Sequence, residues 1–253
     1  MDSMNMFLAE AFGTAMLVLL GNGVVANVVL SRTKGHGAGW IVITAGWAFA
    51  VYTAVLCVAD ISGAHLNPAV SVALAVVGKL EWGMLPGFVI AQMLGGLIGA
   101  AAVFAFYRPH YALTADADAK LATFCTGPAV RDTASNLLGE VVGTFVLVTA
   151  ALVMADASFL FPDGASDAKV LVGLGSIGAV RVGLVVFAIG LCLGGTTGYA
   201  INPARDLSPR LAHTLLPIPG KRDSDWSYAW IPVVGPLAGG VLAAMLHRVW
   251  LAP

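Results

Sequence analysis

The stretch Gly63-Ala64-His65-Leu66-Asn67-Pro68-Ala69 returns later in the chain as Gly198-Tyr199-Ala200-Ile201-Asn202-Pro203-Ala204. Asparagine is a preferred helix N-cap, and proline is favoured at the first helical position. Each stretch therefore predicts a helix that begins at its asparagine. The segments that carry these motifs contain too many prolines or charges to cross a membrane in full, so we expect two short helices from about residues 67 and 202.

The rest of the chain consists of long apolar segments. Of its 253 residues, 58% are hydrophobic and 11% are charged, with a net charge of −1 and a mean hydropathy of +0.87. This composition excludes most soluble enzymes, and the missing basic patch excludes nucleic acid as a partner. A membrane span needs about 20 apolar residues, and six segments qualify: Met6–Leu30, Trp40–Ala59, Trp82–Tyr107, Leu137–Ala155, Val182–Ala204 and Trp226–Leu246. We expect an all-α membrane protein with six transmembrane helices and two re-entrant half-helices in a lipid bilayer.

An internal repeat divides the chain into two halves. The residues around Glu10 (AEAFGT) resemble those around Glu140 (GEVVGT), at an offset of 130 residues (140 − 10). Each half, residues 1–130 and residues 131–253, contains three spans and one half-helix. Because three is odd, the second half enters the membrane from the opposite side, and the repeats are inverted, as in many transport proteins. The half-helices are then expected to meet near the midplane of one pore domain.

The meeting point of the half-helices is expected to suit neutral polar solutes. Two helix N-termini directed at one point form a positive centre that opposes cations. The side-chain amides of Asn67 and Asn202 can donate N–H groups to a passing oxygen. The extended backbone before each asparagine is expected to expose carbonyl oxygens along the path, from Gly63, Ala64, His65, Leu66, Thr197, Gly198 and Ala200.

Buried charges are expensive in a membrane and therefore point to function. Arg205, three residues after the second cap, is expected to reach into the pore, with Asp206 as its partner or facing another helix. Glu10 and Glu140 are expected to accept hydrogen bonds from backbone N–H groups of the re-entrant loops. The run GLGSIG at residues 173–178 matches a nucleotide-binding pattern but lacks its βαβ context. We expect no cofactor, no metal and no catalytic residue.

The paired Asn-Pro-Ala motifs resemble those of the aquaporin superfamily, and an aspartate directly after Arg205 resembles its glycerol-facilitator branch, the aquaglyceroporins. The resemblance extends over essentially the whole chain. It implies the aquaporin fold and a passive channel that carries glycerol, other polyols and water but excludes ions and protons. It also implies a homotetramer in the cell membrane with one pore per subunit.

The resemblance further implies a selectivity filter near the outer mouth, formed here by Trp47, Gly190, Tyr199 and Arg205. Trp47 and Tyr199 would form an apolar corner for a carbon backbone, while Arg205 and carbonyl groups bind hydroxyls. Gly190 leaves space where water-selective relatives usually carry histidine. Tyr199 stands where glycerol-facilitator relatives often carry phenylalanine, and its hydroxyl is expected to narrow the filter or add a polar contact.

Other functions stay open on the sequence. A pore mainly for water, or for undissociated weak acids such as lactic acid, would use the same architecture. A coupled secondary transporter also shares inverted repeats and broken helices, with Glu10 and Glu140 as the only acidic candidates for an ion site.

The family topology places both termini in the cytoplasm and leaves four basic residues inside and eight outside, against the positive-inside rule. Cys57 and Cys192 lie in apolar runs and are expected to be buried.

Overall fold

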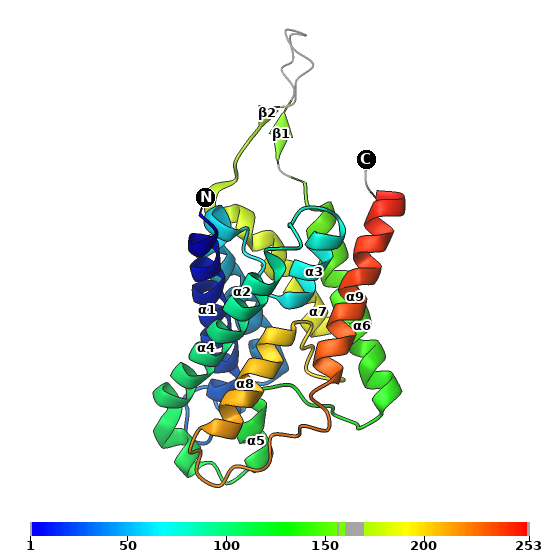
Figure 1. Cartoon of the computed structure of the whole chain (residues 1–253). Helices are drawn as coiled ribbons and strands as arrows, with labels where there is room; N and C mark the ends of the chain where they lie inside the picture. Colours follow the sequence, from blue (N-terminus) through cyan, green and yellow to red (C-terminus); the bar gives the residue numbers. More distant parts are fainter. Residues whose placement is uncertain (1, 156, 160–169, 252–253) are drawn as a thin grey trace.

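The computed structural model describes residues 2–155, 157–159 and 170–251, which form a bundle of long helices around two short ones (Figure 1). Six helices are long and apolar enough to cross a membrane: α1 (Ser3–Val29), α2 (Trp40–Ser62), α4 (Leu85–Leu113), α6 (Thr133–Val153), α7 (Val180–Cys192) with the preceding 3₁₀ turn η1 (Gly175–Ala179), and α9 (Ile231–Leu246) with its π-helical extension η2 (His247–Leu251). The half-helices are α3 (Pro68–Val76) and α8 (Pro203–Leu215). Both chain ends lie at one end of the bundle (Figure 1).

The fifth predicted span extends well beyond the end of the observed helix. We expected Val182–Ala204, but α7 ends at Cys192. Two glycines follow, and the backbone then takes left-handed conformations at Gly198 (φ 84°), Tyr199 (φ 39°) and Ile201 (φ 44°). A helix cannot continue through such residues, so the apolar segment returns as an extended loop to the start of α8. Two further elements were not expected, the short helix α5 (Ala117–Ala122) and a hairpin of β1 (Ser158–Phe159) with β2 (Val170–Leu171).

The two halves pack in the same manner. Helix α4 lies against α1, and α9 lies against α6. A Cβ atom added to Gly95 would lie 2.1 Å from the carbonyl oxygen of Ala11, and one on Gly239 would lie 2.2 Å from that of Val141. Only glycine permits backbones this close, and such contacts hold helices together where lipid removes the hydrophobic drive. Ala11 and Val141 are separated by the repeat offset of 130 residues (141 − 11).

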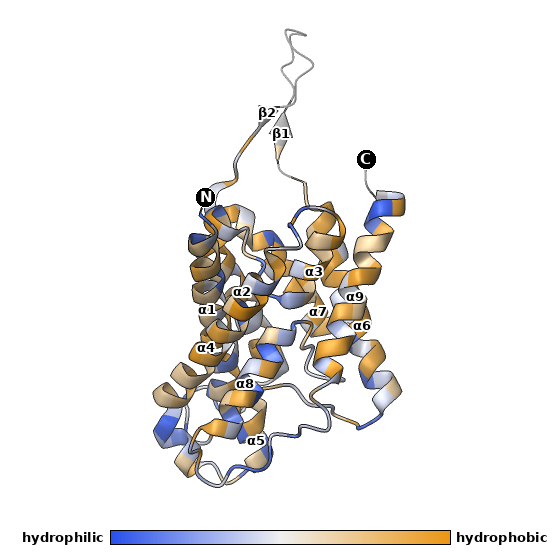
Figure 2. Ribbon diagram, viewed as in Figure 1, coloured by the Kyte–Doolittle hydropathy of each residue, from blue (hydrophilic) through white to orange (hydrophobic). Residues whose placement is uncertain are grey.

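The outer surface of the bundle is apolar, whereas polar residues gather at its ends and inside (Figure 2). Large side chains such as Phe49, Phe106 and Leu8 are exposed on the helices. A hydrocarbon environment makes this arrangement favourable. The two cysteines that we expected to be buried, Cys57 and Cys192, are exposed. Apolar context signals burial in a soluble protein but contact with lipid here.

Candidate functional site

The half-helices begin beside each other at their asparagine caps. The Oδ1 atom of Asn67 accepts a hydrogen bond from the N–H of Ala69 at 2.9 Å, and that of Asn202 accepts from the N–H groups of Ala204 and Arg205 at 3.0 and 3.2 Å. Pro68 and Pro203 occupy the first positions of α3 and α8. Both caps therefore use their side-chain oxygen on their own helix, which leaves the amide nitrogen for other partners.

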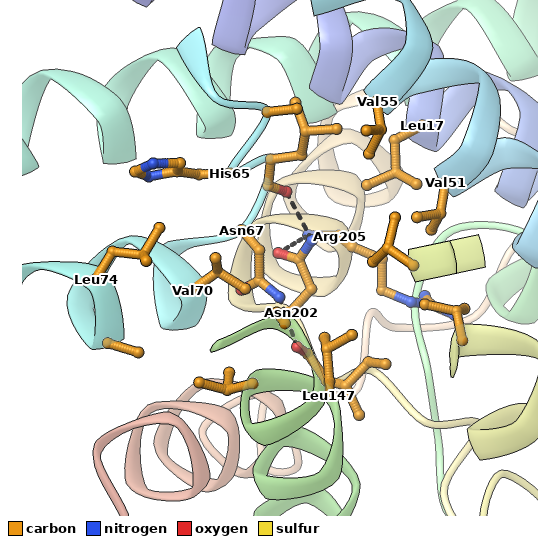
Figure 3. Close-up of a pocket in the computed structure, with 18 of the residues that line it drawn as sticks. Leu17, Val51, Val55, His65, Asn67, Val70, Leu74, Leu147, Asn202 and Arg205 are labelled. Carbon is orange, nitrogen blue, oxygen red and sulfur yellow. Dashed lines mark hydrogen bonds between the residues drawn. The ribbon is translucent and has the colours of Figure 1, made fainter. Parts of the chain in front are cut away.

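Each asparagine amide binds the opposite repeat. The Nδ2 atom of Asn67 donates to the carbonyl oxygen of Ile201 at 2.8 Å, and that of Asn202 donates to the carbonyl oxygen of Leu66 at 2.8 Å (Figure 3). These two bonds fix the asparagines beside one another. Because an amide nitrogen carries two hydrogens, each asparagine retains one N–H, and both residues line a common cavity.

Glu10 holds the first re-entrant loop from within the core. Its Oε1 atom accepts from the N–H of His65 (2.9 Å) and the hydroxyl of Ser62 (2.7 Å). Its Oε2 atom accepts from the N–H of Leu66 (2.7 Å) and the amide of Gln92 (2.8 Å). A loop at membrane depth needs partners for its backbone groups because lipid offers none. The carboxylate provides them and thereby sets the direction of the Leu66 carbonyl.

Glu140 holds the second loop in the corresponding way. Its Oε1 atom accepts from the hydroxyl of Thr197 (2.7 Å) and the N–H of Ala200 (3.0 Å), and its Oε2 atom accepts from the N–H of Ile201 (2.8 Å). The Glu140 side chain is fully buried. The two inverted loops thus share one design, in which a buried carboxylate binds the last residues before the asparagine.

A cavity of about 310 Å³ runs along the two asparagines. One part of its wall is apolar and is formed by Leu17, Val51, Val55, Val70, Leu74 and Leu147 (Figure 3). The cavity is also lined by the loop residues Gly63, Ala64, His65, Leu66 and Ala200 together with Asn67, Asn202 and Arg205. The cavity therefore offers both hydrocarbon surface and hydrogen-bonding groups.

Two of the residues that we expected to expose carbonyl oxygens along the path, Thr197 and Gly198, are not among the described residues that line this cavity. Thr197 is buried, and its hydroxyl binds Glu140. The Gly198 carbonyl accepts a 3.5 Å hydrogen bond from Nη2 of Arg205. Thr197 and Gly198 therefore bind other residues of the site, Glu140 and Arg205 respectively.

Arg205, Trp47 and Tyr199 all line this cavity. The guanidinium carbon of Arg205 lies 4.1 Å from the centroid of the Trp47 ring. Tyr199 is buried and makes an edge contact with Trp40, whose Nε1 donates to the carbonyl oxygen of Gly190 at 2.9 Å. These three side chains thus bring two aromatic rings and one guanidinium to the lining of the cavity.

Gly190, the fourth expected filter residue, lies behind Tyr199. A Cβ atom there would lie 2.9 Å from Cζ of Tyr199 and 2.8 Å from Cγ2 of Thr44. The tyrosine ring occupies the space that the sequence analysis assigned to the lumen. The Tyr199 hydroxyl is buried and has no hydrogen-bond partner within the described part of the chain.

A buried ion pair that the sequence analysis missed braces the outer end of α8. Asp206 accepts from Nη2 of Arg210 at 2.8 Å and from the N–H and hydroxyl of Thr126 at 2.7 and 2.6 Å. Arg210 is fully buried and also donates to the carbonyl oxygens of Thr126, Ser224 and Asp225. Asp206 thus faces Arg210 instead of Arg205. The four-residue spacing of an aspartate and an arginine on one helix face is the signal that would have revealed the pair.

Outside the spans, Asp225 connects this brace to the next loop. Its carboxylate forms an ion pair with Arg131 and accepts from the hydroxyl of Ser227 at 3.0 Å. Burial alone would raise the pKa of Asp225, but the hydrogen bonds from Arg131 and Ser227 outweigh burial and lower it. The loops around α5 and before α9 are therefore joined to α8 by charged contacts.

Known proteins resemble this chain over its full length. The profile of the family described as Major intrinsic protein matches residues 1–247. A probable glycerol uptake facilitator protein of Thermotoga maritima is 53% identical over 248 residues, which cover 98% of this chain and 100% of that protein. A glycerol uptake facilitator protein of Streptococcus pneumoniae is 49% identical over 247 residues, covering 98% and 100%. The X-ray structure of the aquaglyceroporin from Plasmodium falciparum superposes with a TM-score of 0.83 at 28% identity, covering 100% of this chain and 98% of that one.

Proposed function

The chain belongs to the major intrinsic protein family, and on that premise we propose that it is a passive channel for glycerol and other small uncharged solutes. Relatives named glycerol uptake facilitators share about half of its residues over their whole length. It is a channel rather than an enzyme, and a multi-pass protein of the cell membrane. Six apolar spans and the fold of an aquaglyceroporin agree with this assignment.

The observation that carries the proposal is the reciprocal pairing of Asn67 and Asn202. The side-chain oxygen of each asparagine accepts from its own half-helix, and one N–H of its amide donates to the opposite loop. One N–H per asparagine therefore remains for a solute. The helix N-termini behind them add a positive potential. A hydroxyl oxygen can accept from these donors, whereas a cation is repelled by them and by the helix N-termini. We infer that ions and protons are excluded at this point and that water passes.

We propose that Trp47, Tyr199 and Arg205 form a constriction that suits a polyol rather than water alone. Trp47 and Tyr199 provide apolar surface for the CH groups, and Arg205 provides donors for the hydroxyl groups. A polyol presents CH groups as well as hydroxyls, so it can contact the aromatic rings and the guanidinium at once. We propose that Trp47, Tyr199 and Arg205 form the selectivity filter and that Gly190 contributes by leaving room for the tyrosine ring.

Both buried carboxylates favour a channel over a coupled transporter. Each oxygen of Glu10 and Glu140 already accepts a hydrogen bond from its loop. Binding a driving cation at either carboxylate would compete with these bonds and release the loop. We therefore propose transport without ion coupling.

The exposed apolar helix faces leave room for two kinds of neighbour. We propose that they contact lipid and identical subunits in a homotetramer with one pore per subunit. Cross-linking in membranes followed by mass determination tests the tetramer. A monomer under conditions that cross-link a known tetramer would contradict it.

Stopped-flow light scattering on proteoliposomes tests the proposed function. Vesicles without any ion gradient are exposed to glycerol, a larger polyol, lactic acid or an impermeant osmolyte that reports water flux. We expect glycerol entry far above that of protein-free vesicles, with a rate that rises linearly with glycerol concentration. Saturating entry that requires an ion gradient would indicate a coupled transporter. Water flux without glycerol flux would indicate a water channel, and lactic acid flux without glycerol flux would indicate a weak-acid channel.

A further inference from the structure

A glycine of α1 lies directly behind the tryptophan of the constriction. A Cβ atom added to Gly21 would lie 2.2, 2.3 and 2.4 Å from Cζ3, Cε3 and Cη2 of Trp47. Ordinary van der Waals contact begins at 3.4 Å. Three adjacent ring atoms at nearly equal distance indicate that the position lies over the six-membered ring and not at its edge. The indole therefore rests on the backbone of α1 at a residue that has no side chain.

The cavity lies on the other side of the indole, away from Gly21. Trp47 and Arg205 line the cavity, whereas Gly21 is not among the described residues that line it, so the glycine lies behind the ring as seen from the lumen. Trp47 is 3% exposed and belongs to a buried cluster that includes Leu17 and Val25. Close packing on the other sides leaves the lumen as the direction in which the ring can move.

Helix α1 is held in place by close backbone contacts with α4, beside the face that carries Gly21. A Cβ atom on Gly99 of α4 would lie 2.5 Å from the carbonyl oxygen of Ala15, so a shift of α1 would disturb these contacts. A side chain at position 21 must therefore displace the indole, by about 1.2 Å if the full difference to ordinary contact (3.4 − 2.2) is taken up by the ring. The displacement is directed toward Arg205, which already lies 4.1 Å from the ring centroid.

We propose that Gly21 is a specificity-determining residue that sets the width of the constriction without touching the solute. It acts as a positioning residue for Trp47, and the inference rests on the proposed solute channel. Any larger residue at position 21 narrows the gap between Trp47 and Arg205. A narrower gap hinders a polyol more than water, because the polyol must place its carbon chain against the indole.

The Gly21→Ala variant tests this inference by the ratio of glycerol to water permeability in proteoliposomes. We expect glycerol permeability to fall about tenfold, the factor that corresponds to ~1.4 kcal/mol and lies at the lower end of overpacking costs. Water permeability should fall much less. The matched control is Gly23→Ala on the same helix, where an added Cβ atom meets no atom within 4 Å, and it should keep the wild-type ratio.

A second variant identifies Trp47 as the route of the effect. Gly21→Ala combined with Trp47→Phe replaces the indole by a smaller ring, so the clash is relieved and glycerol permeability should recover relative to Gly21→Ala. If Gly21→Ala alone does not yield folded protein, the same double variant should restore both yield and glycerol flux.

The outcomes separate this inference from the proposed function. Wild-type protein without glycerol flux would refute the proposed function. Wild-type glycerol flux together with an unchanged glycerol-to-water ratio in Gly21→Ala would overturn the inference alone. A double variant that restores neither flux nor yield would also overturn it, because the effect would then not pass through the indole.

Discussion

Replacing Glu140 by glutamine should loosen the second re-entrant loop. The two side chains have nearly the same shape, so the change tests hydrogen bonding and not packing. Oε1 of Glu140 accepts two hydrogen bonds and Oε2 accepts one. Glutamine keeps one acceptor oxygen, and the less costly orientation places its NH₂ group where Oε2 faces the N–H of Ile201. The donor of Ile201 then loses its partner and meets another donor.

The cost follows from the number of bonds affected. Losing a hydrogen bond to an ionised acceptor costs about 1.5–3 kcal/mol, and leaving the buried donor unpaired adds about 1–3 kcal/mol. The two remaining bonds weaken because a neutral acceptor gives roughly half the strength of a charged one. Removing a buried charge offsets part of this loss. We expect a net destabilisation of roughly 3 kcal/mol, and a thermal midpoint lower by roughly 6–12 °C for a chain of this size.

Thermal unfolding in detergent, followed by tryptophan fluorescence, measures the midpoint, and stopped-flow scattering measures glycerol entry. Glycerol entry should fall as well, because the Ile201 carbonyl orients the Asn67 amide. The exposed residue Glu81 provides the control, and Glu81→Gln should match the wild type in both assays. A Glu140→Gln variant with the wild-type midpoint and wild-type glycerol flux would show that Glu140 does not hold the loop.

Three further changes probe the constriction and its outer brace. Gly190→His should push the Tyr199 ring into the lumen and reduce glycerol flux while sparing much of the water flux in stopped-flow assays, and an unchanged glycerol-to-water ratio would remove Gly190 from the filter. Arg205→Val should raise the permeability of larger polyols and of protons, measured with osmotic and pH-sensitive dye assays, whereas wild-type selectivity would place Arg205 outside the pore. Because the pKa of Asp225 is lowered from 3.8, its ion pair with Arg131 stabilises the protein above that pH and is lost below it. The difference in thermal midpoint between wild type and Asp225→Asn should therefore shrink as the pH falls from about 6 to about 3, and a constant difference would contradict this.

The sequence contained enough information for the spans, the half-helix starts and the two buried glutamates. These features depend on local signals: apolar length, an Asn-Pro cap, and a repeated motif with a membrane-buried acid. The end of α7 was missed because Leu193 to Ile201 contains no charged residue and no proline, and the backbone angles show that the helix has stopped. Apolar composition alone does not separate a span from a loop buried inside the bundle.

Side-chain packing could not be predicted from motif positions. The sequence indicated that Gly190 opens space, but it did not show that the Tyr199 ring fills that space, and nothing in the motif pointed to Gly21. The charge pattern misled for a related reason. Of the eight outer basic residues, Arg210 is buried against Asp206, while Lys120 and Lys221 donate to loop carbonyl oxygens. These basic residues hold the outer loops together. Their number therefore reflects the fold of those loops and not the orientation of the chain in the membrane.

The central claim is that the paired asparagines and the half-helix ends behind them pass neutral solutes and stop ions. The most direct test measures proton and sodium flux in the same proteoliposomes that carry glycerol, with an imposed pH or sodium gradient and internal indicator dyes. We expect rapid glycerol equilibration with ion leakage no greater than in protein-free vesicles. Proton or sodium flux that rises in proportion to the amount of reconstituted protein would contradict the claim.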